Sequence, residues 1–320
     1  MDNIMVSVYC LAYNHEKYIR KTLEGFVHQK TDFSFEVIIH DDASTDHTAE
    51  IIREYEKKYP EIIFPIYQKE NQYSQKKLIV PNYIYPKIRG KYIAVCEGDD
   101  YWCDESKLQM QVDFLENHKE YVACVHNTLR LDYKNHKQEL FNAKKEDYDP
   151  DFREIIQGGA SCYHQSSLIY KREILENRPD FLKVARGMGD YPLSIFLALS
   201  GKIHYFGKVM SVYRYGVEGS WTVRVRTNKE KTIHHLETEI EMLNEVDQYS
   251  QYKFHEIVQD VILHREYKIA ELEEKYNQLK KGKFRKIYLK KSFKHKIKIW
   301  VLLYAKPLYR VYEQKHNLYQ

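Results

Sequence analysis

The residues with the clearest capacity for chemistry are five acidic side chains in one short stretch, CEGDDYWCDE, at positions 96–105. The stretch directly follows KYIAV, an apolar run that is typical of a buried strand. Two like charges ~4 Å apart repel each other by about 4 kcal/mol at an effective dielectric constant near 20. Such a cluster therefore requires protonation, basic partners or a cation.

The ligand types in this acidic stretch favour a hard cation. Carboxylates without His or Cys suit Mg²⁺ or Mn²⁺, which bind through one or two carboxylates and complete their shells with water and phosphate oxygens. We therefore expect a binding site for a metal ion and a diphosphate. The alternative is an acidic loop with solvated carboxylates that caps a helix beginning at Lys107. Zinc is not indicated, because the motifs at His15 and His255 lack the second histidine of HExxH.

The elements that must position this cluster alternate between strand and helix through about residue 125. Strands are predicted in MVSVYCL, FEVIIH, EIIFPIYQ and KYIAVCE, with a helical pattern after each; the third of these helices starts near Pro81. This order predicts an α/β fold with a doubly wound, mostly parallel sheet, whose ligands bind beyond the carboxyl ends of the strands. Strands one, two and four end in AYN, HDD and CEGDD, so we expect these polar groups to converge on one edge.

Beyond residue 130 the alternation loosens. Residues 132–155 are polar and are predicted to form a loop, whereas GMGDYPLSIFLALSG opens a helix and residues 228–281 form a helical hairpin. The predicted organisation is a domain over 1–225, with a nucleotide-binding half at 1–125 and an acceptor half at 126–225, followed by a helical extension over 226–320.

Composition excludes several classes of protein. The mean hydropathy is −0.65, and no stretch approaches the roughly 18 apolar residues of a membrane-spanning helix. The N-terminal MDNIMVSVYCLAYN lacks a basic region and a cleavage site, so we expect a cytoplasmic chain without a signal peptide. The five cysteines contain no CxxC pair, which favours reduced, mostly buried thiols.

Charge is distributed unevenly along the chain. Residues 280–320 hold eleven Lys and two Arg against one acid, Glu313, a net charge of +12, whereas the remainder carries −8. Apolar residues at helical spacing interleave these cations, which predicts a basic amphipathic helix on an anionic membrane surface. The alternative is a solvated helix that packs on the body or on another subunit. No nucleic-acid-binding motif accompanies the charge, so we expect no nucleic acid partner.

Three motifs in order, VSVYCLAYNHEKYIRKTLEGFVHQ, EVIIHDDASTDHT and GKYIAVCEGDDYW, resemble those of family 2 glycosyltransferases of the GT-A fold. The resemblance covers residues 5 to about 120 and is closest to the inverting enzymes of bacterial surface-polysaccharide synthesis. It implies transfer of a sugar from a nucleotide-sugar donor, a UDP-sugar, to a saccharide or lipid-linked saccharide acceptor. Mg²⁺ or Mn²⁺ would assist, and the enzyme would lie peripherally at the inner face of the plasma membrane.

The resemblance also implies roles for donor-binding residues. Tyr13 and Asn14, in AYN, would flank the donor base, and Asp41 or Asp42 would accept a hydrogen bond from it. Lys76 stands near the position of a diphosphate-binding arginine of the family. The threonine that usually precedes Tyr-Asn is absent here, where the sequence has LA.

Metal and catalytic roles follow from the same resemblance. Asp99 and Asp100 would hold the ribose and the metal, with Glu97 as the first acid of a DxD-like pattern. The catalytic base would be Asp190, in GMGDYP, where Gly189 replaces the glutamate of the family's ED motif. The alternative role of Asp190 is to cap the helix that it opens.

A loop near YRYGVEGSW corresponds to the one that closes over the diphosphate in relatives. Arg214, Ser220 and Trp221 are its candidate residues, and a purely structural loop is the alternative. His164 in GGASCYHQSS is a candidate for the acceptor side, or else a core histidine.

Two other functions remain open from the sequence. A sugar nucleotidyltransferase would share the sheet and the acidic site, but LAYNHEKY has no glycine-rich loop after the first strand. A non-catalytic assembly subunit would use the helical hairpin at 228–281 for protein contacts.

Overall fold

The computed structural model describes residues 4–133, 135–158, 161–184, 189–217 and 228–305. The chain divides into two compact units, Met1–Val223 and Arg224–Gln320. Within the described residues, no helix is both long enough and apolar enough to cross a membrane. The five cysteines are free thiols and all but Cys103 are buried, as the sequence predicts.

The first unit is built on one mixed sheet with the strand order β3-β2-β1-β4-β8-β6-β9-β5, and β7 pairs with β6. Its strands are β1 (Val6–Ala12), β2 (Phe35–Asp41), β3 (Ile63–Tyr67), β4 (Tyr92–Val95), β5 (Tyr101–Trp102), β6 (Tyr121–Asp132), β7 (Lys137–Leu140), β8 (Ile169–Lys171) and β9 (Lys202–Tyr215). The parallel pairings extend over four to eleven residue pairs each. The antiparallel ones extend over only two to four, so the sheet is mostly parallel, as predicted.

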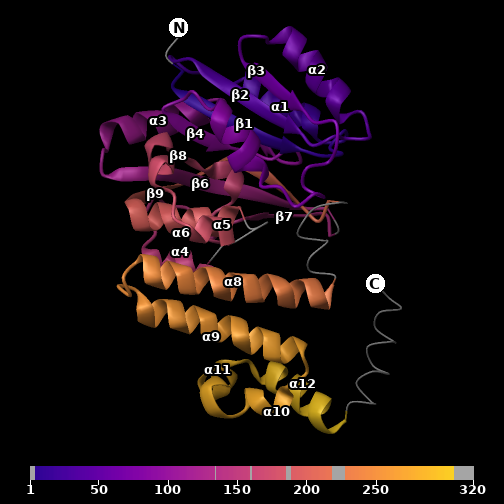
Figure 1. Ribbon diagram of the computed structural model, residues 1–320, viewed down its shortest axis with the longest axis vertical. Helices are drawn as coiled ribbons and strands as arrows, with labels where there is room; N and C mark the ends of the chain where they lie inside the picture. The colour runs from indigo at the N-terminus through magenta and orange to yellow at the C-terminus, as the bar shows by residue number, and fades with distance from the viewer. Residues whose placement is uncertain (1–3, 134, 159–160, 185–188, 218–227, 306–320) are drawn as a thin grey trace. The chain divides into compact units, whose positions relative to one another are not determined.

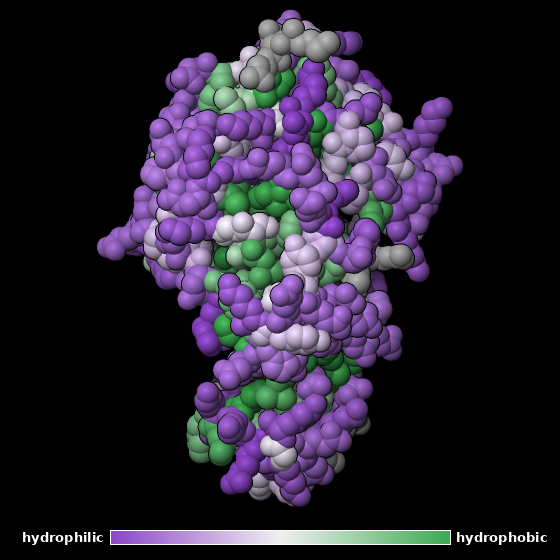
Figure 2. Space-filling view, turned by 60° about the vertical axis from the view of Figure 1, so that its left-hand side comes forward, coloured by the Kyte–Doolittle hydropathy of each residue, from purple (hydrophilic) through white to green (hydrophobic). Residues whose placement is uncertain are grey.

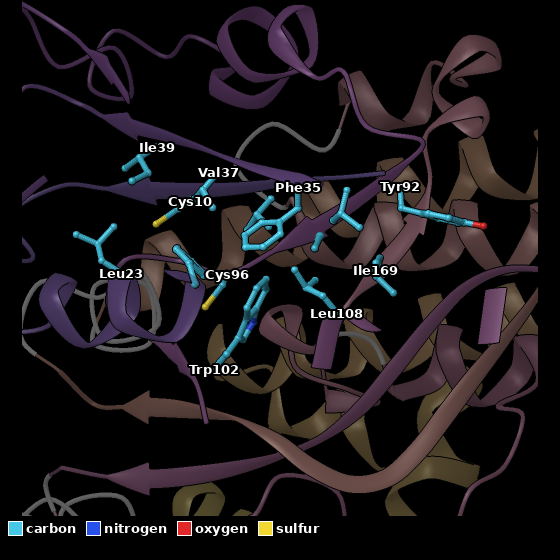
Figure 3. Close-up of a cluster of buried hydrophobic side chains, with 14 of the residues drawn as sticks. Cys10, Leu23, Phe35, Val37, Ile39, Tyr92, Cys96, Trp102, Leu108 and Ile169 are labelled. Carbon is cyan, nitrogen blue, oxygen red and sulfur yellow. The ribbon is translucent and has the colours of Figure 1, made fainter. Parts of the chain in front are cut away.

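Helices cover both faces of this sheet (Figure 1). They are α1 (Ile19–Val27), α2 (Thr48–Lys58), α3 (Lys107–Asn117), α4 (Phe152–Gly158), α5 (Phe181–Val184) and α6 (Asp190–Ser200). Alternate residues of β1 point to opposite faces. Val8 and Cys10 belong to a core that includes residues of α1, α2 and α3 (Figure 3). Tyr9 belongs to a second core with residues of α4 and α6. The sheet is therefore doubly wound.

Two local predictions require correction. The segment near Pro81 is helical, but it forms a π-helical turn (Val80–Ile84) and a 3₁₀ turn (Tyr85–Lys87) instead of one α-helix. Pro81 and Pro86 lack the N–H groups that a regular α-helix needs. The predicted loop over 132–155 contains β7, which pairs with β6, and the start of α4.

The second unit is helical, with α8 (Lys229–Tyr249), α9 (His255–Leu272), α10 (Tyr276–Leu279), α11 (Arg285–Lys290) and α12 (Phe293–Tyr304). The predicted hairpin is present as α8 and α9, joined across their surfaces by the ion pair between Arg265 and Glu239. The basic segment is not one helix, because Gly282 adopts a positive φ and Ser292 starts a new helix at α12. Part of its apolar surface is buried in a small core that contains Phe284, Ile287 and Ile299.

Gly90 lies against the central strand β1. A Cβ at this position would lie 2.4 Å from the Ser7 nitrogen and 2.7 Å from the Val6 carbonyl carbon. We expect Gly90→Ala to lower the free energy of unfolding by about 2–3 kcal/mol, because β1 is held between β2 and β4 and cannot move away. Urea denaturation measures this loss. Gly189→Ala is the matched control, since its Cβ meets no described atom within 4 Å; equal losses in both variants would contradict the argument.

Lys107, the first residue of α3, is fully buried. Its Nζ donates to Gln111 Oε1 at 2.7 Å and lies 4.1 Å from the ring centroid of Trp102. No carboxylate pairs with it among the residues that the structure describes. Burial lowers its pKa to about 7.

The Lys107 pKa shift predicts a pH-dependent stability. The unfolded lysine titrates near pH ~10.4, so the unfolded state binds more protons between about pH 7 and 10, and this residue's contribution to stability rises with pH. We expect the stability advantage of Lys107→Met over wild type to shrink by about 3 kcal/mol between pH 7 and 9.5. Urea titrations at both pH values test this, with the exposed Lys17→Met as control. A difference that is independent of pH would contradict it.

Candidate functional site

The carboxyl ends of β1, β2 and β4 meet at one edge of the sheet. Ala12 pairs with Asp41 in the parallel register of β1 and β2, and Tyr9 pairs with Val95 in that of β1 and β4. The acidic segments that follow β2 and β4 therefore begin on the same edge, as the sequence predicts.

The turn at residues 97–100 is fixed by backbone hydrogen bonds and by α1. The Gly98 N–H donates to Leu11 O at 2.9 Å, and the Asp100 N–H donates to Glu97 O at 3.1 Å. The Thr22 hydroxyl lies against the carbonyl oxygens of both Gly98 and Asp100. Gly98 has no room for a side chain, because a Cβ would lie 2.7 Å from His15 Nδ1. The acidic turn is thus held rigidly before any ligand binds.

Arg214, near the end of β9, donates hydrogen bonds to two residues of this turn. Its N–H donates to Asp100 Oδ1 at 2.8 Å, and its guanidinium donates to Asp99 O at 2.7 Å. The guanidinium carbon lies 5.3 Å from the ring centroid of Tyr18 and 4.5 Å from that of Tyr101. The structure therefore places Arg214 at the acidic turn. Ser220 and Trp221, its predicted partners in a closing loop, lie outside the described residues.

His164 lies close to Asp100. Its Nε2 is 3.7 Å from Asp100 Oδ2, and its ring stacks on Tyr213 with 4.1 Å between centroids. Burial lowers its pKa to about 3, so the ring is neutral at physiological pH. Its Nδ1 lies 2.8 Å from the Ser166 hydroxyl oxygen, and its Nε2 faces Asp100. His164 is thus a largely buried, neutral histidine beside the acidic turn, too far from Asp100 for a hydrogen bond, and its role on the acceptor side stays a prediction.

Asp99 and Glu97 differ from Asp100 in their surroundings. Asp99 Oδ1 is buried and has no hydrogen-bond partner among the described residues. The Glu97 carboxyl is accessible to solvent but surrounded by protein; this partial desolvation, with the negative charges of Asp99 and Asp190, raises its pKa to about 8. Burial and the charge of Asp99 also raise the pKa of Asp100. Burial and like charges thus disfavour the ionised forms of these carboxyl groups, and a bound cation would relieve this.

Asp190 is the first residue of α6, and its charge acts on Glu97 across nearly a hundred residues of sequence. The Tyr191 N–H donates to Asp190 Oδ1 at 2.9 Å, which fixes the carboxylate at the helix start. The structure therefore brings the predicted base toward the acidic turn. Asp190 is the first helical residue and Gly189 is the N-cap, with no side-chain cap hydrogen bond, so the structure does not show the predicted capping by Asp190.

The site fits a hard divalent cation. Within the described part of the chain, no three His, Cys, Asp or Glu side chains form a group that could hold a metal ion by themselves. At Asp99, a buried carboxylate oxygen has no partner in the described part of the chain. This matches an ion that takes one or two carboxylates and completes its shell with phosphate and water oxygens. Asp99 with Glu97 is the pair best placed to hold it, because Asp100 Oδ1 already accepts the Arg214 N–H.

The predicted donor residues lie in two loops that bind each other. Asn14, at φ 55°, accepts the Thr45 N–H at 2.8 Å and thereby joins the loops after β1 and β2. Asp41 accepts from the Ser44 hydroxyl at 2.5 Å, and burial raises its pKa. Tyr13 is 42% exposed and available for stacking.

Asp42 supports the neighbouring loop. Its two carboxylate oxygens accept the N–H groups of Gln72 and Tyr73 at 2.7 and 3.0 Å. Lys76 lies in that loop, is exposed and has a positive φ of 60°. Each carboxylate oxygen of Asp42 retains a second lone pair that a ligand could use.

His15 is the site residue that sequence reasoning misses. Its Nδ1 is buried without a hydrogen-bond partner among the described residues. Burial lowers its pKa, and the charges that act on it include Asp99, Asp46 and Asp41. His15 thus joins the two acidic segments. Its position directly after AYN is the available signal in the sequence.

Comparison with solved structures places this architecture. S. aureus TarS 1–349 in complex with UDP-GlcNAc superimposes with a TM-score of 0.59 at 17% identity, over 92% of this chain and 78% of the TarS 1–349 chain. The mannosyltransferase PcManGT of Pyrobaculum calidifontis, in complex with GDP-Man and Mn²⁺, gives 0.52 at 16% identity, over 89% and 83%. At these identities the similarity establishes the fold, which is GT-A.

Sequence relatives extend the comparison. An uncharacterized protein of Mycobacterium tuberculosis is 34% identical over 223 residues. The match covers 68% of this chain and 60% of the length of that relative. The putative teichuronic acid biosynthesis glycosyltransferase TuaG of Bacillus subtilis is 34% identical over 111 residues, or 35% of this chain and 42% of TuaG. The glycosyl transferase family 2 model matches residues 7–178, more than half of the chain. The chain therefore belongs to glycosyl transferase family 2.

Proposed function

We propose that the protein transfers a sugar from a nucleotide-diphosphate donor, a UDP-sugar, to a saccharide acceptor, with inversion at the anomeric carbon. The observation that carries this proposal is the approach of Asp190, at the start of α6, to the acidic turn of Glu97 and Asp99. A carboxylate close to an acidic turn that would hold a metal and a diphosphate is placed to take the proton of an acceptor hydroxyl.

The reaction follows from these positions. Asp190 takes the proton of the acceptor hydroxyl while that oxygen forms a bond to the anomeric carbon. The bond from this carbon to the β-phosphate oxygen breaks, and its electron pair leaves with the diphosphate. A Mg²⁺ or Mn²⁺ ion held by Asp99 and Glu97 would neutralise the charge that develops there.

The donor base would lie in the loops after β1 and β2. Tyr13 would stack on it, and Asp41 or Asp42 would accept its N–H. Lys76 would reach the diphosphate, and Arg214 would hold the acidic turn in place beneath it. The nucleotide-binding half would be residues 1–125 and the acceptor half residues 126–225.

Relatives support a role in surface-polysaccharide synthesis. TuaG is named for teichuronic acid biosynthesis, and WfaP of Escherichia coli, 30% identical over 129 residues, is named as a glucosyltransferase that uses UDP-Glc and a diphosphoundecaprenol-linked sugar. By this analogy we propose a hexosyl or N-acetylhexosaminyl donor and a lipid-linked saccharide acceptor at the inner membrane face.

A panel of nucleotide sugars tests the donor assignment. Thermal denaturation is measured with each candidate, with and without Mn²⁺. A ligand at about 100 times its Kd stabilises the folded state by about 2.7 kcal/mol, so we expect a UDP-sugar to raise the Tm by several degrees in the presence of the metal. If no nucleotide sugar shifts the Tm under any metal condition, the proposal fails.

A further inference from the structure

The last described helix, α12, has two apolar faces. Its inner face contributes Ile299, which is fully buried, to a core with residues of α9, α10 and α11, and Leu302 and Leu303 pack against the same core. Its outer face carries residues that remain in solvent: Phe293 is 79% exposed and Trp300 is 56% exposed.

The exposed residues form one line along the helix. Phe293, Ile297, Trp300 and Tyr304 are spaced by four, three and four positions, which places them on one side of an α-helix. We call these four residues the outer stripe. All are at least 45% exposed, and the rings of Trp300 and Tyr304 lie 5.7 Å apart. Figure 2 shows hydrophobic residues at the surface at the lower end of the view, where Figure 1 labels α10 to α12. A continuous exposed apolar line of this kind marks an interaction surface.

Positive charge borders the stripe on both sides. At 100° per residue, Lys296 falls on one side of the stripe, and Lys294 and Lys298 fall on the other. No acidic residue occurs between Glu274 and Glu313. The charged side chains of this stretch are therefore all basic. A partner must therefore combine an apolar layer with negative charge.

We propose that the outer stripe docks on the surface of an anionic lipid bilayer. Phe293 and Trp300 would enter the boundary between head groups and acyl chains, while the exposed Lys294 and Lys298 extend to lipid phosphates. Trp and Tyr suit this boundary because each joins an apolar ring to a polar group. The helix is about 18 Å long, too short to span a bilayer, so it lies in the plane of the interface.

This surface differs from the membrane helix that the sequence alone predicts. Phe284 and Ile287, two apolar residues of the predicted membrane helix, are buried within the second unit. Among the described residues of α12, the outer stripe is the apolar surface that remains for lipid. The proposal requires no donor or acceptor sugar, so its test is independent of the proposed reaction.

Co-sedimentation of the full chain with vesicles tests the proposal. Vesicles of phosphatidylcholine with about 30 mol % phosphatidylglycerol supply the anionic surface, and pure phosphatidylcholine vesicles are the comparison. We expect binding to the anionic vesicles that is at least about tenfold tighter. In the Phe293→Ser/Trp300→Ser variant we expect a loss of about tenfold or more. Tyr252→Ser is the matched control, because Tyr252 is a 61% exposed aromatic residue of the same unit; it should bind as wild type does.

Further measurements separate lipid from other occupants. Circular dichroism and the Tm of each variant verify folding. If the double variant unfolds, Lys294→Glu/Lys298→Glu replaces it, since this variant keeps the stripe and should lose the preference for anionic vesicles. A blue shift of tryptophan emission on vesicle addition, reduced in Trp300→Phe, would support insertion.

Equal vesicle binding by wild type and the stripe variants would overturn the proposal. So would a wild-type dimer that the double variant converts to a monomer without any vesicle binding by either, since the stripe would then be a subunit interface.

Discussion

Asp190→Asn is expected to lower kcat by about 10²- to 10⁴-fold, the range found when a general base is removed. Asparagine has nearly the same shape but cannot take the proton of the acceptor hydroxyl. Its side-chain oxygen can still accept the Tyr191 N–H that Asp190 Oδ1 accepts at 2.9 Å, so α6 should begin as before. The donor Kd should stay within about twofold, because the lost interaction is made in the transition state.

The control for this substitution is Asp180→Asn. Asp180 is an exposed aspartate that pairs with Lys183 near the start of α5, so the change removes the same charge from a helix start away from the acidic turn. Its kcat should equal that of wild type. Steady-state kinetics and donor titrations measure both quantities. Unchanged turnover in Asp190→Asn would remove Asp190 as the base, and unchanged function in cells would favour the non-catalytic assembly subunit.

Asp99→Asn is expected to weaken metal-dependent donor binding by about 10- to 100-fold. Within the acidic turn, Asp99 Oδ1 is a buried carboxylate oxygen without a hydrogen-bond partner among the described residues, and an amide is a poorer ligand for a hard cation. In the absence of metal the same substitution removes a charge that raises the pKa values of Glu97 and Asp100. The metal-free variant should therefore be more stable than wild type, by about 1 kcal/mol.

The effects of Asp99→Asn on donor binding and on metal-free stability together distinguish a metal-ligand role of Asp99 from a structural role. Calorimetric titration of UDP with and without Mn²⁺ measures donor binding, and urea denaturation in EDTA measures stability. Asp104→Asn is the control from the same acidic stretch, because Asp104 already pairs with Lys208 at 2.6 Å and should not affect donor binding. Weaker UDP binding by Asp99→Asn in EDTA as well as in Mn²⁺, or a loss of metal-free stability, would show that Asp99 acts by supporting the fold.

Local sequence patterns were sufficient to predict those strands and helices whose formation depends mainly on their own residues. The strands with β-branched residues and the helices with apolar residues at helical spacing appear close to their predicted positions. The shared edge followed because parallel strands end on the same side of a sheet. Prediction failed at Pro81 and Pro86, where missing N–H groups produced short irregular turns, and at β7, whose polar residues form a strand because they pair with β6.

The basic segment shows the same division within one stretch of chain. Its charge and helical spacing were evident from the residues alone. Which apolar residues face solvent depends on the contacts of α12 with α9 and α10, so Ile299 became part of a core while Phe293 remained exposed.

The order of the elements, the positions of the acidic segments and the preference of oxygen ligands for a hard cation could all be read from the amino-acid sequence, because each depends on neighbouring residues. The roles of the individual carboxylates could not. Asp100 accepts an N–H from Arg214, more than a hundred residues away, beside the pairing of β5 with β9, whereas Asp99 Oδ1 has no hydrogen-bond partner among the described residues. Hydrogen bonds between distant segments exist only after the sheet has formed, and local periodicity carries no record of them.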